Sequence, residues 1–350
     1  HAHIDPKNYS IKTRGENAGN RLPCQQAEAQ IDMEINNVRA RLLTGGDIWW
    51  DLDRGRYIVP KPAPGLPEVS AIFAGGVWIG GVDIGNNIKL AGVTYRNATG
   101  FYDWYAGPLD KSGNTELQVC NDWDRFFSVL GSNIQSHIVA FDNYPDPDNF
   151  PCDSIPDDVK YWPGQGNPYW LDKFEFELPD QPLGAFWDEN GNGIYDPCGG
   201  DFPIIDIRKC EPVNRDHAKE LVPDEMKFWI YNDNGSGNHL LTRGQPIRME
   251  VQVQAFAYAT NDQVNDMTFY RYKLLNKAEG DLFNCYFAMW VDPDLGCYQD
   301  DYIGVDVDRS MAYVYNEDAV DGITGCNCSE TPTYCNQVPL LGIDYFRGPR

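Results

Sequence analysis

Hydrophobic and polar residues alternate along several segments of the chain with the two-residue period of β-strands. Residues 247–259, IRMEVQVQAFAYA, show this most clearly, because Val251 and Val253 share one face while Gln252 and Gln254 lie on the other. Runs rich in β-branched and aromatic residues, separated by turns, predict further strands. These runs lie at residues 70–83, 87–96, 226–232, 267–278 and 282–292.

One segment instead has the period of an amphipathic helix. Asn121 is a suitable N-cap for a helix over residues 121–138. Trp123, Phe127 and Ile134 then share one face of that helix. With one prominent helix among many strands, the pattern predicts a mainly β fold, an antiparallel β-sandwich with long loop insertions.

Two stretches depart from the strand pattern. Residues 1–30 are polar and net basic, and we interpret them as an extended arm before a sandwich that covers residues 31–350. Residues 141–213 are rich in Pro, Gly, Asp and aromatic residues, which indicates a loop-rich insertion. The arm has too few apolar residues for a core of its own. We therefore expect it to dock either on another copy of the protein or on its own domain, with Cys24 bonded in the same chain.

The charge balance narrows the range of partners. The formal net charge is −24, and a field of this sign repels nucleic acid phosphates and anionic membrane surfaces. It suits divalent cations or neutral ligands such as sugars. No apolar run reaches the ~20 residues of a membrane span, so we expect no membrane insertion. The chain opens on HAHIDPKNYS, without a signal peptide, and we expect the mature form of an extracellular or cell-surface protein.

Ten cysteines are spread along the chain without a C-x-x-C pair, so a structural zinc site has little support. Their even number and their position in loop-like segments favour disulfides formed in an oxidising compartment. Spacing does not fix the connectivity, but Cys198 with Cys210 and Cys285 with Cys297 would each close a short local loop. A set of reduced, buried thiols is the alternative.

Residues 186–203, FWDENGNGIYDPCGGDFP, carry oxygen-bearing side chains at alternate positions around two glycines. Calcium takes about six to eight oxygen ligands, and glycine lets the chain wrap closely around the ion. The predicted Ca²⁺ ligands are the side chains of Asp188, Asn190, Asn192, Asp196 and Asp201 and the carbonyl of Ile194. The segment is not an EF-hand, because Gly199 stands where that motif needs a glutamate. We predict a short calcium loop with a structural role; a solvated Asn-Gly turn without metal is the alternative.

A second acidic segment, residues 291–310, gathers aspartates that repel one another unless a cation or a basic partner compensates them. We predict a second cation site here, with Asp292, Asp294, Asp300 and Asp301 as its ligands. A solvated acidic surface is the alternative.

Catalytic motifs give little support to an enzyme. G-x-S-x-G, H-E-x-x-H, the phosphate-binding P-loop and G-x-G-x-x-G are all absent from the sequence. Ser236 and His239 are close in a glycine-rich turn, which is a poor arrangement for a catalytic triad. We expect the aromatic pairs Tyr161–Trp162 and Tyr169–Trp170 to be exposed beside carboxylates. They favour, as the alternative function, a glycan-binding module or a glycoside hydrolase on a β-sandwich.

Six segments together resemble a known family: NNVRARLLTGGDIWWDL, SAIFAGGVWIGGVD, FWDENGNGIYDPCGGDFP, VPDEMKFWIYNDNG, QAFAYATNDQVNDMTFYRYKLLN and WVDPDLGCYQDDYIGVDVDR. From about residue 35 onward the chain is similar to the N-terminal region of large secreted surface proteins of Bacteroidetes, exported by the type IX secretion system. The resemblance implies export and attachment at the cell surface, but it brings no catalytic residues. Asp153-Ser154-Ile155 fits the short O-glycosylation motif of these bacteria, with Ser154 as the acceptor.

These features point to one function. We expect a secreted structural or adhesive protein, with Ca²⁺ as its cofactor, that binds other copies of itself or cell-surface components. In the alternative function, glycans are the partners.

Overall fold

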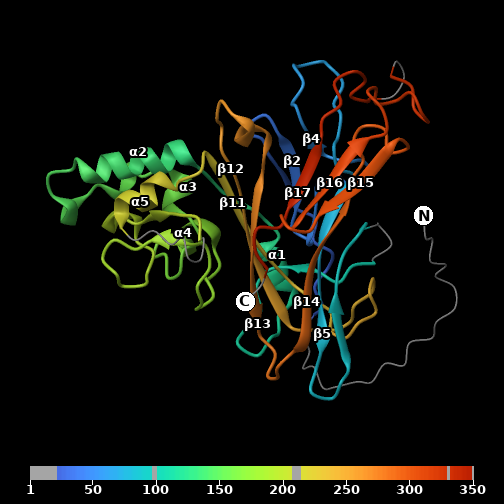
Figure 1. Cartoon of the computed structure of the whole chain (residues 1–350). Coiled ribbons are helices and arrows are strands. Elements are labelled where there is room, and N and C mark those ends of the chain that lie inside the picture. The colour runs from blue at the N-terminus through green and yellow to red at the C-terminus, as the bar shows by residue number, and fades with distance from the viewer. Residues whose placement is uncertain (1–21, 97–100, 207–213, 329–331, 349–350) are drawn as a thin grey trace.

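Antiparallel sheets dominate the structure and helices are few (Figure 1). The computed structural model describes residues 22–96, 101–206, 214–328 and 332–348. Two sheets pack face to face, and a layer of helices and loops covers the other face of one of them. The mainly β, sandwich-like fold predicted from the sequence pattern is confirmed.

The first sheet of the sandwich contains seven strands. They are β1 (Gln30–Met33), β2 (Arg39–Leu43), β3 (Asp47–Ile48), β4 (Tyr57–Ile58), β5 (Ala74–Val82), β6 (Ile88–Ala91) and β14 (Phe283–Asp292). The main path runs β1-β2-β3-β5-β14, with β4 beside β2 and β6 beside β5. The longest pairing joins β5 to β14, from Ala74 opposite Asp292 to Val82 opposite Phe283.

The middle sheet contains five strands. They are β7 (Tyr105–Ala106), β8 (Phe127–Leu130), β11 (Glu225–Asn232), β12 (Met249–Ala257) and β13 (Phe269–Asn276). β11 pairs with β12 along one side and with β7 and β8 along the other. In β11 and β12, apolar residues with odd numbers face the first sheet, so that Trp229 and Val251 pack with Leu42 in one hydrophobic core.

The third layer covers the other face of the middle sheet, at the left of Figure 1. It contains α2 (Gly131–Asp142), α3 (Asp157–Lys160), α4 (Trp170–Phe174), α5 (Arg215–Glu220), the 3-10 turns η1 (Pro147–Asn149), η2 (Cys152–Ser154) and η3 (Pro197–Gly199), and the paired strands β9 (Phe186–Trp187) and β10 (Phe202–Pro203). Phe228 and Phe256 of the middle sheet pack with Ile134 and Tyr195 of this layer in a second core. Two further helical elements are α1 (Leu117–Trp123), before β8, and η4 (Gln263–Asp266), before β13.

The polar face of β12 is buried, although its alternation is typical of a strand with one side in solvent. Gln252 and Gln254 are 1% and 2% exposed. Gln254 donates to the carbonyl of Ile204 at 3.0 Å and accepts from the amide of Asp206 at 3.3 Å. Gln252 donates to the carbonyl of Pro182 at 3.0 Å. These side chains therefore provide hydrogen-bond partners for the irregular backbone of the third layer.

The helix predicted over residues 121–138 is wrong in its bounds. The chain forms α1, then the strand β8, and then α2 from Gly131. Phe127 lies opposite Phe228 of β11, and this pairing requires an extended backbone that a helix cannot supply. Asp124, between α1 and β8, accepts hydrogen bonds from the amides of residues 28 and 29. With 12 residues, α2 is the longest helix of the described chain.

A third, smaller sheet follows β14 and was not predicted. β15 (Asp301–Asp306), β16 (Met311–Asn316) and β17 (Leu341–Asp344) pair antiparallel in this order, in the upper right of Figure 1. Aspartate disfavours strands, and pairing with β16 overrides that preference in β15. Val314 of β16 and Tyr334, which precedes β17, reach the core between the first two sheets.

Four disulfides lie in the described part of the chain, as the cysteine pattern predicted. They join Cys24 to Cys120, Cys152 to Cys198, Cys297 to Cys326, and Cys328 to Cys335. Each of the last three closes within one region of the fold, whereas the first joins the N-terminal segment to α1.

The two local pairings that spacing suggested are wrong. Cys198 bonds to Cys152 of the neighbouring turn η2, and Cys210 lies outside the described residues. Cys297 bonds to Cys326, while Cys285 is free and exposed. Because β14 advances by about 3.3 Å per residue from Cys285 to its last residue, the strand carries the two cysteines apart.

Residues 22–30, the described part of the predicted arm, pack on the domain that follows them. Cys24 is 4% exposed, and its amide donates to the carbonyl of Gly235 at 2.8 Å. Its disulfide to Cys120 lies within the chain, which is one of the two arrangements expected for the arm. Residues 1–21, on which contact with another copy was predicted, lie outside the described residues.

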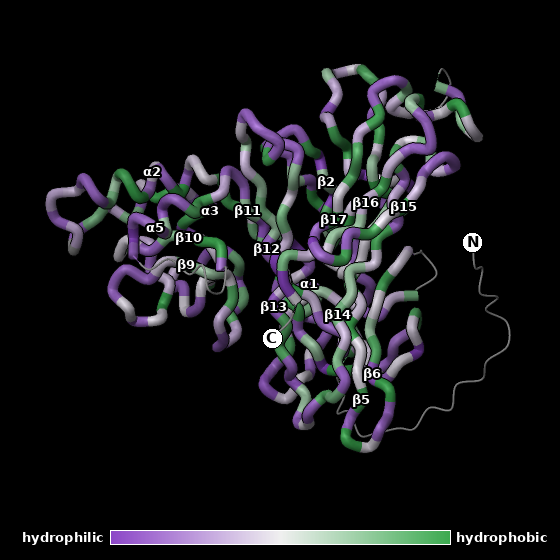
Figure 2. The backbone as a smooth tube through the Cα atoms, in the orientation of Figure 1, coloured by the Kyte–Doolittle hydropathy of each residue, from purple (hydrophilic) through white to green (hydrophobic). Residues whose placement is uncertain are grey.

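Hydropathy follows this layering. Figure 2 shows hydrophobic stretches along the strands of the packed sheets and along α2, and many hydrophilic stretches in the loops between them. Within the described residues, no helix combines the length and apolar character that a membrane crossing requires.

Replacing Gln254 by Leu is expected to lower the free energy of unfolding by about 2–4 kcal/mol, because the Ile204 carbonyl and the Asp206 amide lose their partner. Urea denaturation followed by tryptophan fluorescence measures the change. Gln118, exposed on α1, is the matched control, and Gln118→Leu should change the free energy by less than about 0.5 kcal/mol. A loss for Gln254→Leu as small as that of the control would contradict the role assigned to the buried polar face.

Candidate metal sites

The Asp188 loop, residues 188–201, joins the two strands of the β9–β10 ribbon in the third layer. Antiparallel pairing of these strands brings the two ends of the loop together. The Asp188 carboxylate accepts hydrogen bonds from the amides of Gly191 at 2.8 Å and Gly193 at 2.6 Å. Both glycines have positive φ angles, +71° and +77°, which a residue with a Cβ atom adopts only with strain. The two glycines therefore let the chain turn around the carboxylate.

Short-range hydrogen bonds continue along the loop. The side-chain oxygens of Asn190 and Asn192 accept from backbone amides two residues further on, at 3.0 and 2.7 Å. Asp196 does the same at 3.0 Å, at the start of η3. These contacts are Asx turns, which shape the backbone locally. Ile194, predicted to offer its carbonyl, lies on the solvent side, and the residue is 47% exposed.

Asp201 lies buried at the base of the loop. Its carboxylate accepts from the amides of Glu189 at 2.8 Å and of Asp196 at 2.7 Å, so that it connects the start of the loop to its end. Burial raises the pKa of Asp201 to about 6; the two amides oppose this rise, and the charges of Asp188 and Asp196 add to it. Of the predicted ligands, Asp188 and Asp201 therefore each hold two backbone amides of the loop, but the carboxylate oxygens of Asp188, Asp196 and Asp201 do not all lie within 4.8 Å of one another.

A cation held by this loop would stabilise its shape. Each carboxylate has lone pairs on two oxygens, so it can accept a hydrogen bond from an amide and also bind an ion. The loop is anchored by the disulfide from Cys198 to Cys152 and by an ion pair between Glu189 and Arg215 at 2.8 Å. A donor set of carboxylate and amide oxygens fits Ca²⁺ better than Zn²⁺, which prefers nitrogen and sulfur.

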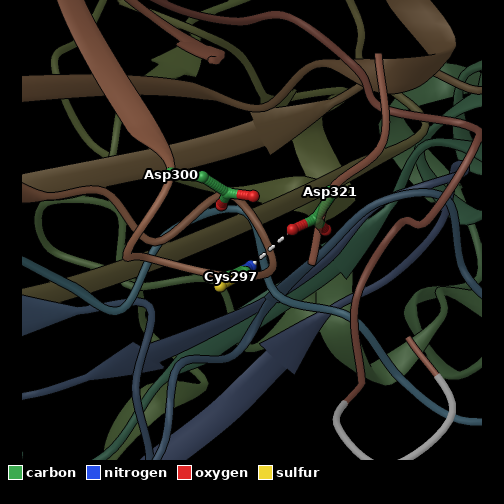
Figure 3. A group of neighbouring side chains, drawn as sticks. All are labelled: Cys297, Asp300 and Asp321. Carbon is green, nitrogen blue, oxygen red and sulfur yellow. Dashed lines mark hydrogen bonds between the residues drawn. The ribbon is translucent and has the colours of Figure 1, made fainter. Parts of the chain in front are cut away.

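A second group of acidic side chains is buried beside the sheet of β15, β16 and β17, which we call the C-terminal sheet. One oxygen of Asp300, one of Asp321 and the sulfur of Cys297 lie within 4.8 Å of one another, and all three residues are buried (Figure 3). Cys297 offers no thiolate, because its sulfur is bonded to Cys326. Two carboxylates at this separation repel each other by about 3–4 kcal/mol at an effective dielectric constant of about 20. We refer to Asp300, Asp321 and the adjacent Asp301 as the carboxylate cluster.

Asp321 is held by the backbone around it. Its carboxylate accepts from the amide of Cys297 at 2.9 Å and from the amide of Tyr334. Gly296 has a φ of +79°, and a Cβ atom at this position would lie 2.1 Å from an oxygen of Asp321. A glycine is therefore required where the backbone approaches the carboxylate.

Asp300 and Asp301 are only half satisfied. One oxygen of Asp300 accepts from the amide of Gly322 at 3.1 Å, and one oxygen of Asp301 accepts from the amide of Leu295 at 2.8 Å. The other oxygen of each carboxylate is buried without a hydrogen-bond partner among the described residues. Such oxygens are costly unless they bind a proton or an ion.

The structure brings three predicted ligands of the second cation site close enough for their charges to interact: Asp294, Asp300 and Asp301. Burial raises the pKa of Asp294 to about 7, and the charges of Asp292 and Asp301 add to the rise. Burial likewise raises the pKa of Asp301 to about 6, with a further contribution from the charge of Asp300. Asp292 accepts a hydrogen bond from the hydroxyl of Tyr95 and is engaged outside the cluster.

Asp321 was not predicted as a ligand. It lies in EDAVDG after β16, far along the chain from Asp300 and outside the acidic segment 291–310 that drew the prediction. The pairing of β15 with β16 brings the two segments together. Only a prediction of that strand pair could have found this residue.

Ser236 and His239 do not form a catalytic pair. The hydroxyl of Ser236 bonds to that of Tyr105, and the ring nitrogens of His239 lie against the carbonyls of Leu90 and Asp233. The imidazole is buried, and its Nε2 lies 3.3 Å from the Asp233 carboxylate. Burial alone would lower the pKa of His239, but the hydrogen bond to Asp233 and the nearby carboxylates outweigh it and raise the pKa to about 9.

Two predicted surface features have different outcomes. The aromatic pairs at residues 161–162 and 169–170 were expected to be exposed, but Trp162 and Trp170 are each 1% exposed and belong to the second core. Their indoles therefore offer no surface on which a sugar could stack. Ser154, the predicted glycosylation acceptor, is exposed at the end of η2, where its side chain is accessible.

Comparisons of the chain with protein-family models, with curated proteins and with solved structures each found no match. The similarity to secreted surface proteins of Bacteroidetes therefore stays a prediction from sequence. Function is argued below from the two groups of carboxylates and from the disulfides.

The stability of the protein is expected to fall by about 1–3 kcal/mol as the pH rises from near 6.5 through 9. The pKa of His239 is raised in the folded state, so its contribution is complete below the ordinary pKa of 6.5 and is lost as pH passes about 9. Urea denaturation across this range measures the loss, and His239→Gln should remove this part of the pH dependence. An NMR titration of the wild-type ring that gives a pKa near 6.5 would contradict the prediction.

In excess chelator, Asp294→Asn is expected to raise the free energy of unfolding at pH 8 by about 1 kcal/mol or more. The pKa of Asp294 is about 7 when folded and near 3.8 when unfolded, so the wild-type carboxyl group destabilises the protein increasingly as pH rises through this window. Below about pH 4 both proteins should therefore be equally stable. Denaturant curves at pH 4 and 8 test this, with Asp172→Asn on the exposed side of α4 as control. Equal stability at pH 8 would show that the carboxyl group is not perturbed.

Proposed function

We propose that this protein is a secreted structural or adhesive protein that calcium stabilises at the Asp188 loop. The observation that carries the proposal is a loop turned around the carboxylates of Asp188 and Asp201, whose ends are fixed by the β9–β10 ribbon. Hard oxygen ligands of this kind match the preference of Ca²⁺. An ion that binds the folded loop, but not the unfolded chain, stabilises the protein by mass action.

Disulfides support an extracellular or cell-surface location. They form and persist in oxidising compartments, and four of them lie in the described part of the chain. A net charge of −24 suits a surface that meets divalent cations and saline solution. The similarity to proteins exported by the type IX secretion system supports the same location.

The surface of the C-terminal sheet supports contact with other copies of the protein or with cell-surface components. β15 is an edge strand of that sheet, and Ile303 and Val305 on it are 66% and 68% exposed. An exposed apolar edge strand offers unpaired backbone groups to a strand from another molecule. Association through such an edge fits a structural or adhesive role.

Excess calcium is expected to raise the unfolding temperature above its value in excess chelator. The gain in stability is about 2–3 kcal/mol per site when free calcium is about 100 times its Kd. The double variant Asp188→Asn/Asp201→Asn should lose the part contributed by the loop, whereas the exposed Asp172→Asn should lose none. Calorimetry in both solutions measures the difference. If the double variant keeps the whole calcium-dependent gain, the loop is not the stabilising site.

A further inference from the structure

The carboxylate cluster lies where three segments of the chain meet. Asp300 and Asp301 stand at the start of β15, and Asp321 follows β16. The loop that leads from β14 to β15 passes between them, since the amides of Leu295 and Cys297 donate to Asp301 and Asp321. A ligand of these carboxylates would therefore contact the start of β15, the segment after β16 and the loop that follows β14.

Buried oxygens without partners give a second observation, which is independent of the gathering of negative charge. Asp300 is 2% exposed, and one of its carboxylate oxygens has no hydrogen-bond partner among the described residues. Figure 3 shows the carboxyl groups of Asp300 and Asp321 turned toward each other. The same lack of a partner holds for one oxygen of Asp301 and for the side-chain oxygen of Asn316, which lies opposite Asp301 in the β15–β16 pairing. A buried carboxylate oxygen without a hydrogen-bond partner is available to bind an ion.

Basic side chains do not compensate the cluster. Arg309 of the β15–β16 hairpin pairs with Asp306, at the end of β15 that lies away from the cluster. Among the described residues, no ion pair involves Asp300, Asp301 or Asp321. Buried charges normally form ion pairs or bind metals. Because no basic side chain in the described part of the chain neutralises these carboxylates, a cation from solution is the expected partner.

We propose that Asp300, Asp301 and Asp321 bind a divalent cation of the calcium type, and that this ion fastens the C-terminal sheet to the sandwich. Carboxylate and amide oxygens are the ligands such an ion prefers. The nearby sulfur is excluded, because Cys297 is already bonded to Cys326.

This site is separate from the Asp188 loop and does not depend on the proposed function. Residues around the loop, such as Tyr195, belong to the core under the third layer, whereas Leu295 and Tyr334 beside the cluster belong to the core of the sandwich. Tyr334 also donates its hydroxyl proton to the carbonyl of Val59 at 2.8 Å, and the amide of Gly296 donates to the carbonyl of Ser70 at 3.0 Å. An ion in the cluster would therefore strengthen contacts with the first sheet.

Hydrogen exchange on the whole wild-type chain tests the proposal with Ca²⁺ alone as the probe. Amides that donate to the cluster, those of Leu295, Cys297, Gly322 and Tyr334, should exchange about tenfold or more slowly in excess calcium than in excess chelator. The measurement is repeated in Asp188→Asn/Asp201→Asn, where stabilisation through the loop is removed. Slower exchange at the cluster that persists in this variant supports the proposal even if the loop binds nothing. Unchanged exchange at these amides in both proteins overturns it, whatever the loop does.

The double variant Asp300→Asn/Asp321→Asn separates an ion site from a merely acidic core. Removing the two like charges should raise the unfolding temperature in chelator above the wild-type value, and calcium should no longer slow exchange at residues 295 and 297. The exposed Asp308→Asn, from the same hairpin, should behave as wild type in both solutions. A double variant that keeps the calcium-dependent protection overturns the proposal. Should it fail to fold, the exchange measurement on the wild-type chain decides alone.

Discussion

The middle sheet is covered on both faces, and the rest of the structure depends on this double burial. A strand in such a sheet has no solvent side, so each polar side chain must find its hydrogen-bond partner inside the protein. β12 meets this requirement because its apolar and polar residues lie on opposite faces of the strand. Val251 and Val253 face the first sheet, while Gln252 and Gln254 bind backbone groups of the third layer. A layer with little regular structure thereby gains a partner for its own backbone.

Most strands of the sandwich could be predicted from the sequence, because their signal is local. β5, β11, β12, β13 and β14 all lie within runs of alternating or β-branched residues. The segment around Phe127 could not be assigned in this way, because its apolar residues fit the period of a helix as well as that of a strand. β11, a distant partner, decides between the two. β15 was not predicted for the same reason: its aspartates indicate a loop when the segment is considered alone, and it becomes a strand by pairing with β16.

The candidate sites also differ in whether their residues are close together in the sequence. The oxygens of the Asp188 loop follow one another in the sequence, so spacing alone could select them. In the carboxylate cluster, Asp300 and Asp301 were predicted because many aspartates lie close together in that part of the sequence. Asp321 comes from a later segment, which the pairing of β16 with β15 brings beside them. The burial of Trp162 and Trp170 could not be predicted from composition, because a segment rich in Pro and Gly can still place its largest side chains in a core. Whether a residue faces solvent is a property of the assembled layers.

The pairing of β5 with β14 also has a consequence for how the chain reaches its final form. Val82 lies opposite Phe283, so the edge of β5 that pairs with β14 stays open until the whole segment between these two strands has been made. At about 5–20 residues per second, synthesis of the intervening segment takes on the order of ten seconds or more. During that time the apolar side chains of β5 lack their final neighbour, and contacts between such distant segments also form slowly. A chaperone or a translocation channel that keeps the nascent chain extended would protect this strand from premature association.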